Sequence, residues 1–395
     1  MEGPVNQRFK SVQLLALTIA ALLFTSTRLP ADSGTCGGVT ITLPFTDVAG
    51  NLFFCQIAEA FFTGLTNGTT PTTYSPLDTV TRQQMAAFIT RTHDSALARG
   101  SRRAALKQWA TPTVLPASVK TTVGTGTAGL ASDGEDIWVA DQLSDDVKRV
   151  HASDGSVLGT WTGADGAAQV LIARGRVFIT GQISPGSLYI INPRQAPGPV
   201  NVLSVPLPDL PLGITTDGTS LWTANFSSVS KIDVDTPSVT TVTAGFNQPH
   251  GMVFDGTNVW VTDALNNTLD KLDSNGTILQ TVTVGSQPFT PVFDGANIWV
   301  PNNLGPSVTV VRARDGQVIA TLTGNGLNSP ASVAFDGQRI LVTNNLTNEL
   351  SLWRATDLTP LGSMSTGNGT SPSGSCSDGI NFWIGFRASG QLVRF

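Results

Sequence analysis

Apolar and polar positions alternate along most of this chain in short segments. In residues 251–285 four such segments follow one another: GMVFD, NVWVTD, TLDKLD and ILQTVTVG. The last two alternate clearly, as half-buried strands do, and an Asp-Gly pair separates the first two, as in a tight turn. The pattern predicts a unit of four antiparallel strands.

This four-strand unit recurs. Its Asp-Gly pair begins at residues 133, 217, 255, 294, 336 and 378, and a degenerate copy, RGRVFITG, begins at Arg174. The spacings are 41, 43, 38, 39, 42 and 42 residues. Four strands in roughly 40 residues are typical of a β-propeller blade. Seven copies therefore predict seven blades.

The two ends of the array complement each other. The last copy stops at QLVRF, after its third strand, whereas residues 118–126, SVKTTVGTG, resemble a fourth strand. Pairing these segments removes two exposed sheet edges. We predict an all-β fold, a seven-bladed β-propeller over residues 118–395 closed by an N-terminal strand and preceded by a small helical module.

The composition supports this fold class and excludes one class of binding partner. Hydrophobic residues make up 40% of the chain and charged residues 13%, with 40 Gly and 23 Pro, as expected for many strands and turns. The net charge of −5 provides no basic surface. We therefore expect no nucleic-acid partner.

The first residues have the pattern of an export signal. Arg8 and Lys10 precede the apolar run 14–24, which is short for a membrane span. We expect a signal peptide over residues 1–31 and no transmembrane span after its cleavage, with an uncleaved anchor as the alternative. The protein would then be secreted, periplasmic or associated with the cell envelope.

Cysteine usage agrees with export. Cys36 and Cys55 lie close together in the sequence, and an oxidising compartment makes a disulfide between them plausible. Cys376 has no obvious partner, so we interpret it as a buried apolar residue.

A separate module is expected over residues 32–99, followed by a basic linker over 100–117. Ile57, Phe61, Phe62 and Leu65 fall on one helical face. Thr81 and Gln84 have the spacing of a capping box that opens a second helix.

Both parts of the chain resemble known families. Residues 255–273 and 294–311 are similar to the YVTN and NHL-type propeller repeats of exported bacterial proteins. That resemblance implies the architecture and leaves the activity open, because this fold hosts binding proteins, lyases and lactonases.

The module before the propeller resembles an S-layer homology repeat. The matching residues are Phe45, Asp47, Val48, 64–65, 74–76 and 80–84. The resemblance implies docking to cell-envelope polymers, with Thr81 and Arg82 contributing. This sequence departs from the family pattern in two ways. It has one copy of the repeat instead of several, and Gln84 replaces the commoner acidic residue.

In a propeller, the starts of first strands and the ends of second strands share one face. That face is expected to form a ligand-binding rim with the residues Asp141, Asn225, Phe226, Asp263, Phe289, Asn302, Asn344, Phe386 and Arg387. Its Asp and Asn residues allow two interpretations. They could hold Ca or Mg through oxygen ligands, with Asp141 and Asp263 supplying the charge, or each could cap its own turn. We favour turn capping, because similar residues at the same position of several repeats suggest a shared local role.

His250 is the candidate catalytic residue. It lies in QPHGMVFDG at the predicted rim, and a general base needs an orienting partner, for which Asp263 is the candidate. The resemblance of this chain to virginiamycin-type lyases is limited to the fold and this Pro-His-Gly motif. His151 is expected on the opposite face.

We therefore predict an exported, non-enzymatic binding or scaffold protein whose partner is a cell-envelope polymer or another extracytoplasmic protein, with no cofactor. The alternative is a propeller lyase or lactone hydrolase that uses His250 with a divalent metal at the axial mouth.

Overall fold

The computed structural model describes residues 31–36, 39–62, 66–82, 84–85, 88, 119–203, 207–208 and 210–395. The chain divides into two compact units, residues 1–109 and 110–395. The predicted signal peptide, the helical position Leu65 and the linker 100–117 lie outside the described residues. Among the described residues, no helix combines the length and the apolar composition that a membrane crossing requires.

The first unit contains a hairpin as well as a helix. Strands β1 (Asp32–Cys36) and β2 (Val39–Leu43) pair in antiparallel fashion, and helix α2 spans Phe54–Phe62. A disulfide joins Cys36 to Cys55 and so ties β1 to the helix. The hairpin was not predicted, because the helical periodicity that follows it dominates the local pattern.

The apolar face of α2 is narrower than its spacing predicts. Ile57 is buried with Phe45 and Val48, and Phe61 packs against that cluster. Phe62 is 63% exposed, so its predicted place on the buried face is wrong. The core of so small a unit is filled from one side of the helix, and the next position around the helix already faces solvent.

The predicted capping box is present. The backbone N–H of Thr81 donates to Oε1 of Gln84 at 2.8 Å, and the N–H of Gln84 donates to Oγ1 of Thr81 at 3.2 Å. These reciprocal bonds satisfy two amides at a helix start. Thr81 and Arg82 are both exposed.

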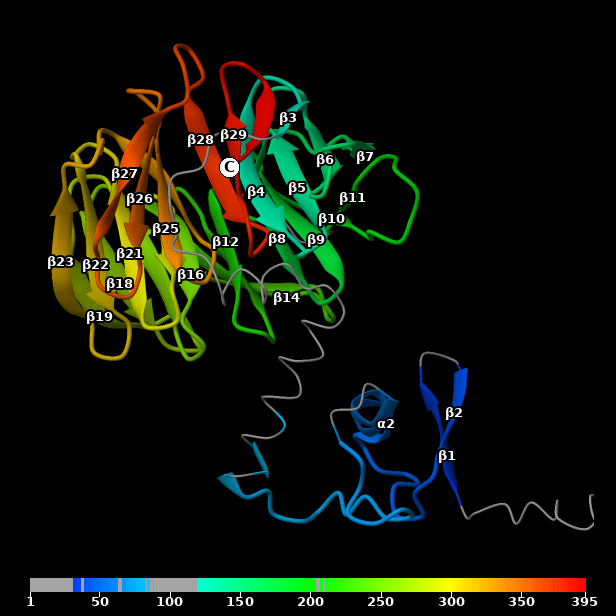
Figure 1. The fold of residues 1–395 in the computed structure, drawn as a ribbon. Helices are drawn as coiled ribbons and strands as arrows, with labels where there is room; N and C mark the ends of the chain where they lie inside the picture. Colours follow the sequence, from blue (N-terminus) through cyan, green and yellow to red (C-terminus); the bar gives the residue numbers. More distant parts are fainter. Residues whose placement is uncertain are drawn as a thin grey trace, which may run out of the picture. The chain divides into compact units, whose positions relative to one another are not determined.

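The second unit is a propeller of seven four-stranded sheets, seen in Figure 1 as successive colours around one centre. All pairings within the sheets are antiparallel. The first three sheets are β4 (Thr127–Ser132), β5 (Asp136–Asp141), β6 (Asp146–His151), β7 (Val157–Thr162); β8 (Ala167–Ala173), β9 (Arg176–Gly181), β10 (Ser187–Ile191), β11 (Asn201–Val202); and β12 (Gly213–Thr216), β13 (Leu221–Ala224), β14 (Val229–Asp233), β15 (Ser238–Val242).

The next three sheets repeat this order. They are β16 (Pro249–Phe254), β17 (Val259–Asp263), β18 (Thr268–Leu272), β19 (Ile278–Thr283); β20 (Val292–Phe293), β21 (Asn297–Asn302), β22 (Ser307–Arg312), β23 (Gln317–Thr323); and β24 (Pro330–Phe335), β25 (Arg339–Asn344), β26 (Glu349–Arg354), β27 (Pro360–Ser365). We number the blades one to seven along the chain.

Blade seven takes its fourth strand from the start of the unit. It consists of β28 (Pro372–Ser377), β29 (Phe382–Phe386), β30 (Gln391–Arg394) and β3 (Val119–Thr122). The register places Thr121 opposite Leu392 and Thr122 opposite Gln391. The first strand of blade seven, β28, also contacts β4 of blade one.

In five blades a Trp stands five residues after the Asp of the Asp-Gly turn: Trp138, Trp222, Trp260, Trp299 and Trp383. The Trp side chains are buried between sheets; Trp138, for example, packs with Val170 and Val177 of blade two. Each indole N–H donates to the Asp five residues earlier, at 2.8 Å for Trp260 and Asp255. The Asp and Trp of the repeat therefore have a structural role.

The first strands of neighbouring blades approach closely, and glycine permits this. A Cβ on Gly251 would lie 2.5 Å from Cα of Thr290, and one on Gly374 would lie 2.0 Å from the carbonyl oxygen of Ala128. The glycine of the Pro-His-Gly motif thus has a packing role.

Candidate functional site: an axial recess

A recess of about 520 Å³ opens at the centre of the propeller. All seven blades contribute to its lining, through their first strands and the turns that follow their second strands. This volume lies in the range of small-molecule sites. The recess is therefore the candidate functional site.

His250 lies on this lining, as the sequence predicted. Its imidazole stacks on Phe289 of the next blade, with 4.1 Å between ring centroids and 2° between planes. Nδ1 is buried without a hydrogen-bond partner in the described structure. Burial lowers the pKa of His250 from 6.5 to about 4, because desolvation disfavours the charged imidazolium. The ring is neutral at pH 7.

The predicted pairing of His250 with Asp263 is wrong. Asp263 is fully buried and accepts hydrogen bonds from the backbone N–H groups of Asn247, Gln248 and Asn266. These bonds fix the loop that enters blade four. This carboxylate therefore makes its hydrogen bonds within its own blade and not with His250.

The other residues at the same repeat position also point into their blades. Asn225 donates to Ser228 and Ser230, Asn302 donates to Ser307 and Thr309, and Asn344 donates to Ser351. All are fully buried. The structure thus places them away from the recess lining. Their amides bond hydroxyls of their own blade, mostly on the third strand, and these contacts differ from the turn capping that the sequence suggested.

Asp141 has a less complete set of partners. Its Oδ1 accepts from the N–H groups of Leu143 and Ser144, while its buried Oδ2 has no hydrogen-bond partner among described residues. Burial raises the pKa of this carboxyl above its ordinary value. Asp141 and Asp263 belong to different blades, and no cluster of three potential metal ligands occurs in the described part of the chain. Neither of the two carboxylates lies on the recess lining.

The aromatic and arginine residues of the predicted rim lie in different environments. Phe289 and Arg387 line the recess. Phe386 is 2% exposed and belongs to the core, whereas Phe226 lies on a turn and is largely exposed. Alternation along the strand explains the split between Phe386 and Arg387, because successive side chains point to opposite sides.

Two glutamines that the sequence did not predict, Gln142 and Gln182, join the predicted Arg387 in the recess. Arg387 donates to Oε1 of Gln142 at 2.7 Å, and Gln142 donates to Oε1 of Gln182 at 2.7 Å. This chain links blades seven, one and two along the lining. Gln142, Gln182, Asn345 and Arg387 each stand one residue after the buried repeat position. The signal available in the sequence was that the residue type at this position varies between blades.

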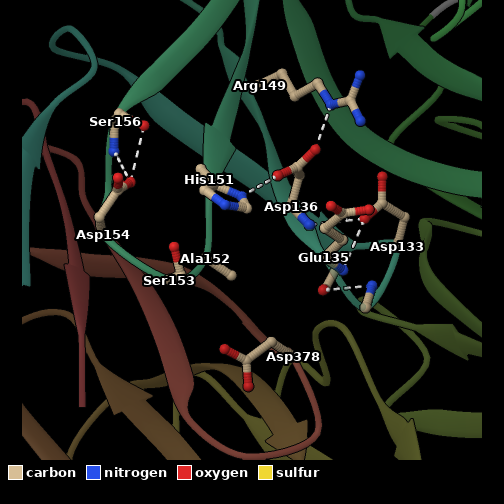
Figure 2. Close-up of polar contacts among 12 residues, drawn as sticks. Asp133, Glu135, Asp136, Arg149, His151, Ala152, Ser153, Asp154, Ser156 and Asp378 are labelled. Atoms are coloured by element: carbon tan, nitrogen blue, oxygen red, sulfur yellow. Dashed lines mark hydrogen bonds and ion pairs between the residues drawn. The ribbon is translucent and has the colours of Figure 1, made fainter. Parts of the chain in front are cut away.

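His151 lies in a different polar cluster, shown in Figure 2. Its Nδ1 contacts Oδ1 of Asp136 at 2.8 Å, and Nε of Arg149 contacts Oδ2 of the same carboxylate at 2.5 Å. The hydrogen bond to Asp136 raises the pKa of His151. Asp136 is 1% exposed, so the two side chains neutralise a buried carboxylate. None of the three lines the recess.

The recess offers hydrogen bonding without an acid–base pair. Its lining contains amides, hydroxyls, His250 and Arg387, and no Asp or Glu among the described residues. Oδ1 of Asn345 is buried and, like Nδ1 of His250, has no hydrogen-bond partner in the described structure. The arrangement can bind a polar ligand, whereas proton transfer would depend on one weakly basic imidazole.

No protein-family model and no curated protein sequence matches the chain. Solved structures do match. Virginiamycin B lyase from Staphylococcus aureus aligns with a TM-score of 0.60 at 16% identity, covering 70% of this chain and 97% of that one. A streptogramin B lyase gives 0.59 at 15%, covering 68% and 93%. The WD40 propeller of Doa1 gives 0.60 at 12%, covering 72% and 97%. These similarities establish the propeller fold of this chain.

Proposed function

We propose that the propeller is a non-enzymatic binding module that takes an uncharged polar ligand, or an uncharged segment of a partner, in its axial recess. The observation that carries this proposal is the recess lining, where amides, hydroxyls and a neutral histidine converge without a carboxylate. A ligand that hydrogen-bonds to Nδ1 of His250 and Oδ1 of Asn345 would satisfy two buried polar atoms that lack partners.

The neutral character of the recess sets its selectivity. Arg387 is the one charged side chain of the lining in the described structure, and it already donates to Gln142. An anionic ligand would have to compete with that amide, and a cationic ligand would find no counter-charge. Neutral saccharides, amides and peptide backbone match the available donors and acceptors.

The test is a thermal-shift screen at pH 7 with three sets of small molecules, neutral, anionic and cationic, matched in size. A neutral ligand near 100 times its Kd stabilises the folded state by about 2.7 kcal/mol and is therefore expected to raise Tm by roughly 5 °C or more. The Gln142→Leu/Gln182→Leu double variant should lose this shift, while Gln280→Leu, on the outer strand β19, should keep it. Hits confined to charged molecules, or shifts that persist in the double variant, would refute the proposal.

A catalytic alternative is a lyase or lactone hydrolase that uses His250, with Mg or Ca at the axial mouth. The position of His250 on the recess, in a fold shared with virginiamycin B lyase, favours it. A pKa of about 4 makes this imidazole a weak base at neutral pH. Purified protein should be assayed against lactones and macrocyclic esters, with and without EDTA. Turnover that disappears in His250→Ala would establish this alternative and overturn the binding proposal.

We further propose that the protein is exported, carries YVTN/NHL-type repeats and associates with the cell envelope through an S-layer-homology-like first unit. The disulfide between Cys36 and Cys55, and the exposure of Thr81 and Arg82 beside an intact capping box, support this. Retention on envelope fractions should fall in a Thr81→Ala/Arg82→Ala variant. Equal retention of the variant would remove this role.

A further inference from the structure

Six consecutive blades expose one large apolar side chain at the turn between their second and third strands. These residues, which we call the apolar tip ring, are Leu143, Ile183, Phe226, Leu265, Leu304 and Leu346. Five are more than half exposed, from 52% for Ile183 to 75% for Leu346, and Phe226 is 46% exposed. Blade seven has Ala388 in its corresponding turn. Five of the six stand two residues after the buried repeat position and Phe226 stands one residue after it, so the repeat exposes an apolar side chain in the same turn of six blades.

The apolar tip ring surrounds the mouth of the recess. Gln142, Gln182 and Asn345, which line the recess, immediately precede Leu143, Ile183 and Leu346 in the chain. Because the seven turns are equivalent positions of one repeat, their tips lie at the same end of the propeller. The ring therefore belongs to one face.

That face carries few charges. Among the described residues of the turns between second and third strands, and of the connections from each fourth strand to the next first strand, the charged residues are Asp145, Asp165 and Arg387. Asp145 accepts from the N–H of Gly166, and Arg387 donates to Gln142. The turns between first and second strands, at the opposite end, each carry a charged residue: Asp133, Arg174, Asp217, Asp255, Asp294, Asp336 and Asp378. The two ends thus differ strongly in their affinity for water.

We propose that the apolar tip ring docks the propeller onto a lipid surface, with the six side chains entering the outer part of the bilayer and the turns resting among the head groups. Leu, Ile and Phe are the residues whose transfer into a membrane is favourable. The described turns and connections of this face hold two carboxylates, Asp145 and Asp165, so few charged groups stand near the lipid.

The spacing of the ring favours a lipid surface over a protein partner. A stable protein interface has a contiguous, densely packed apolar core. Here each apolar tip is flanked by polar turn residues, as in Asn303-Leu304-Gly305, and the ring encloses a polar recess. A second copy placed face to face would trap unpaired amides across that recess. A fluid head-group layer admits isolated side chains and supplies water and hydrogen-bonding groups to the turns.

The charge distribution sets the expected lipid dependence. Electrostatic attachment to membranes depends on clusters of Lys and Arg and weakens with salt. The turns of this face hold one arginine. Binding to neutral phosphatidylcholine vesicles should therefore be as strong as binding to anionic vesicles, and it should persist at high salt.

The first test is flotation of the full chain with phosphatidylcholine vesicles at low and high salt. We expect the wild-type chain to float, and the Leu143→Asn/Leu304→Asn/Leu346→Asn variant to bind about tenfold less tightly, through the lost apolar burial. The matched control is Leu158→Asn/Leu279→Asn/Ile319→Asn, which changes three exposed apolar residues on outer strands. Equal loss in both variants, binding only to anionic vesicles, or loss of binding at high salt would overturn the proposal.

The second test reports on the side chains themselves and is independent of any attachment through the first unit. A polarity-sensitive dye is coupled to Leu304→Cys or, as the control, to Leu279→Cys. Adding phosphatidylcholine vesicles should shift the emission of the first to shorter wavelength and leave the second unchanged. No shift at position 304 would refute lipid insertion, as would a concentration-dependent dimer that the ring variant abolishes, which would assign the face to a second copy.

Discussion

Blade six shows at the scale of single residues what the recurring Asp and Trp accomplish. There Leu341 replaces the Trp, and Arg339 takes over the contact, donating from Nε to Oδ2 of Asp336 at 2.6 Å. The Arg339 guanidinium lies 5.1 Å from the ring centroid of Phe382 in blade seven. A donor to the turn carboxylate and a planar group against the next blade are thus both retained, although the residues differ.

Among the residues that line the recess, His250 has a pKa that burial shifts strongly. Its pKa is about 4 in the folded protein, against 6.5 without burial. Below about pH 6.5 the unfolded chain therefore binds a proton that the folded chain does not. The contribution of His250 to stability is complete above that pH and is lost as the pH falls toward about 4.

Urea unfolding at pH 7 and pH 4.5 checks this linkage. Between these conditions the wild-type protein should lose about 1–2 kcal/mol more unfolding free energy than His250→Gln, which has no titrating ring. Comparison of the two proteins cancels the contribution of the carboxylates. An equal loss in both would show that the imidazole is solvated in the folded state.

At the scale of elements, a buried threonine in the second strand joins neighbouring blades. Thr343 of β25 accepts from the N–H of Ser332 in its own first strand at 3.0 Å and donates to the carbonyl of Ser373 in blade seven at 2.8 Å. Thr262 makes the same two kinds of contact, to Gly251 and Phe289. The first-strand bulges at these positions leave an amide that the hydroxyl satisfies.

The substitution Thr343→Val tests this element. It keeps the shape of the side chain but leaves an N–H and a carbonyl without their partner, so we expect a loss of about 1–3 kcal/mol in unfolding free energy. The control Thr321→Val, on the exposed side of β23, should change stability by less than about 0.5 kcal/mol. Similar effects at the two sites would indicate that the bridging hydroxyl is unimportant.

At the scale of the whole molecule, stability depends on the pairing of β3 with β30. Without β3, blade seven would end at β30 and expose an unpaired strand edge. A chain that begins at Ala110 retains β3, whereas a chain that begins at Gly124 lacks it. The first should unfold in one cooperative transition, and the second should aggregate or melt roughly 10 °C or more below the first. Calorimetry with light scattering checks this, and equal transitions would mean that the propeller does not require the closing strand.

The sequence alone determined the architecture of this protein, because a four-strand unit that recurs every 40 residues or so can bury its apolar faces only against copies of itself. Strand periodicity, the Asp-Gly turns and the recurring Trp are local signals, and the structure confirms each of them. The tertiary structure decided which side chains meet at the axis. A shift of one residue separates buried Asp141 from Gln142 in the recess, and the unpartnered state of His250 depends on groups brought together from different blades. The charge-poor face with its apolar tip ring likewise exists only once the seven turns are assembled at one end.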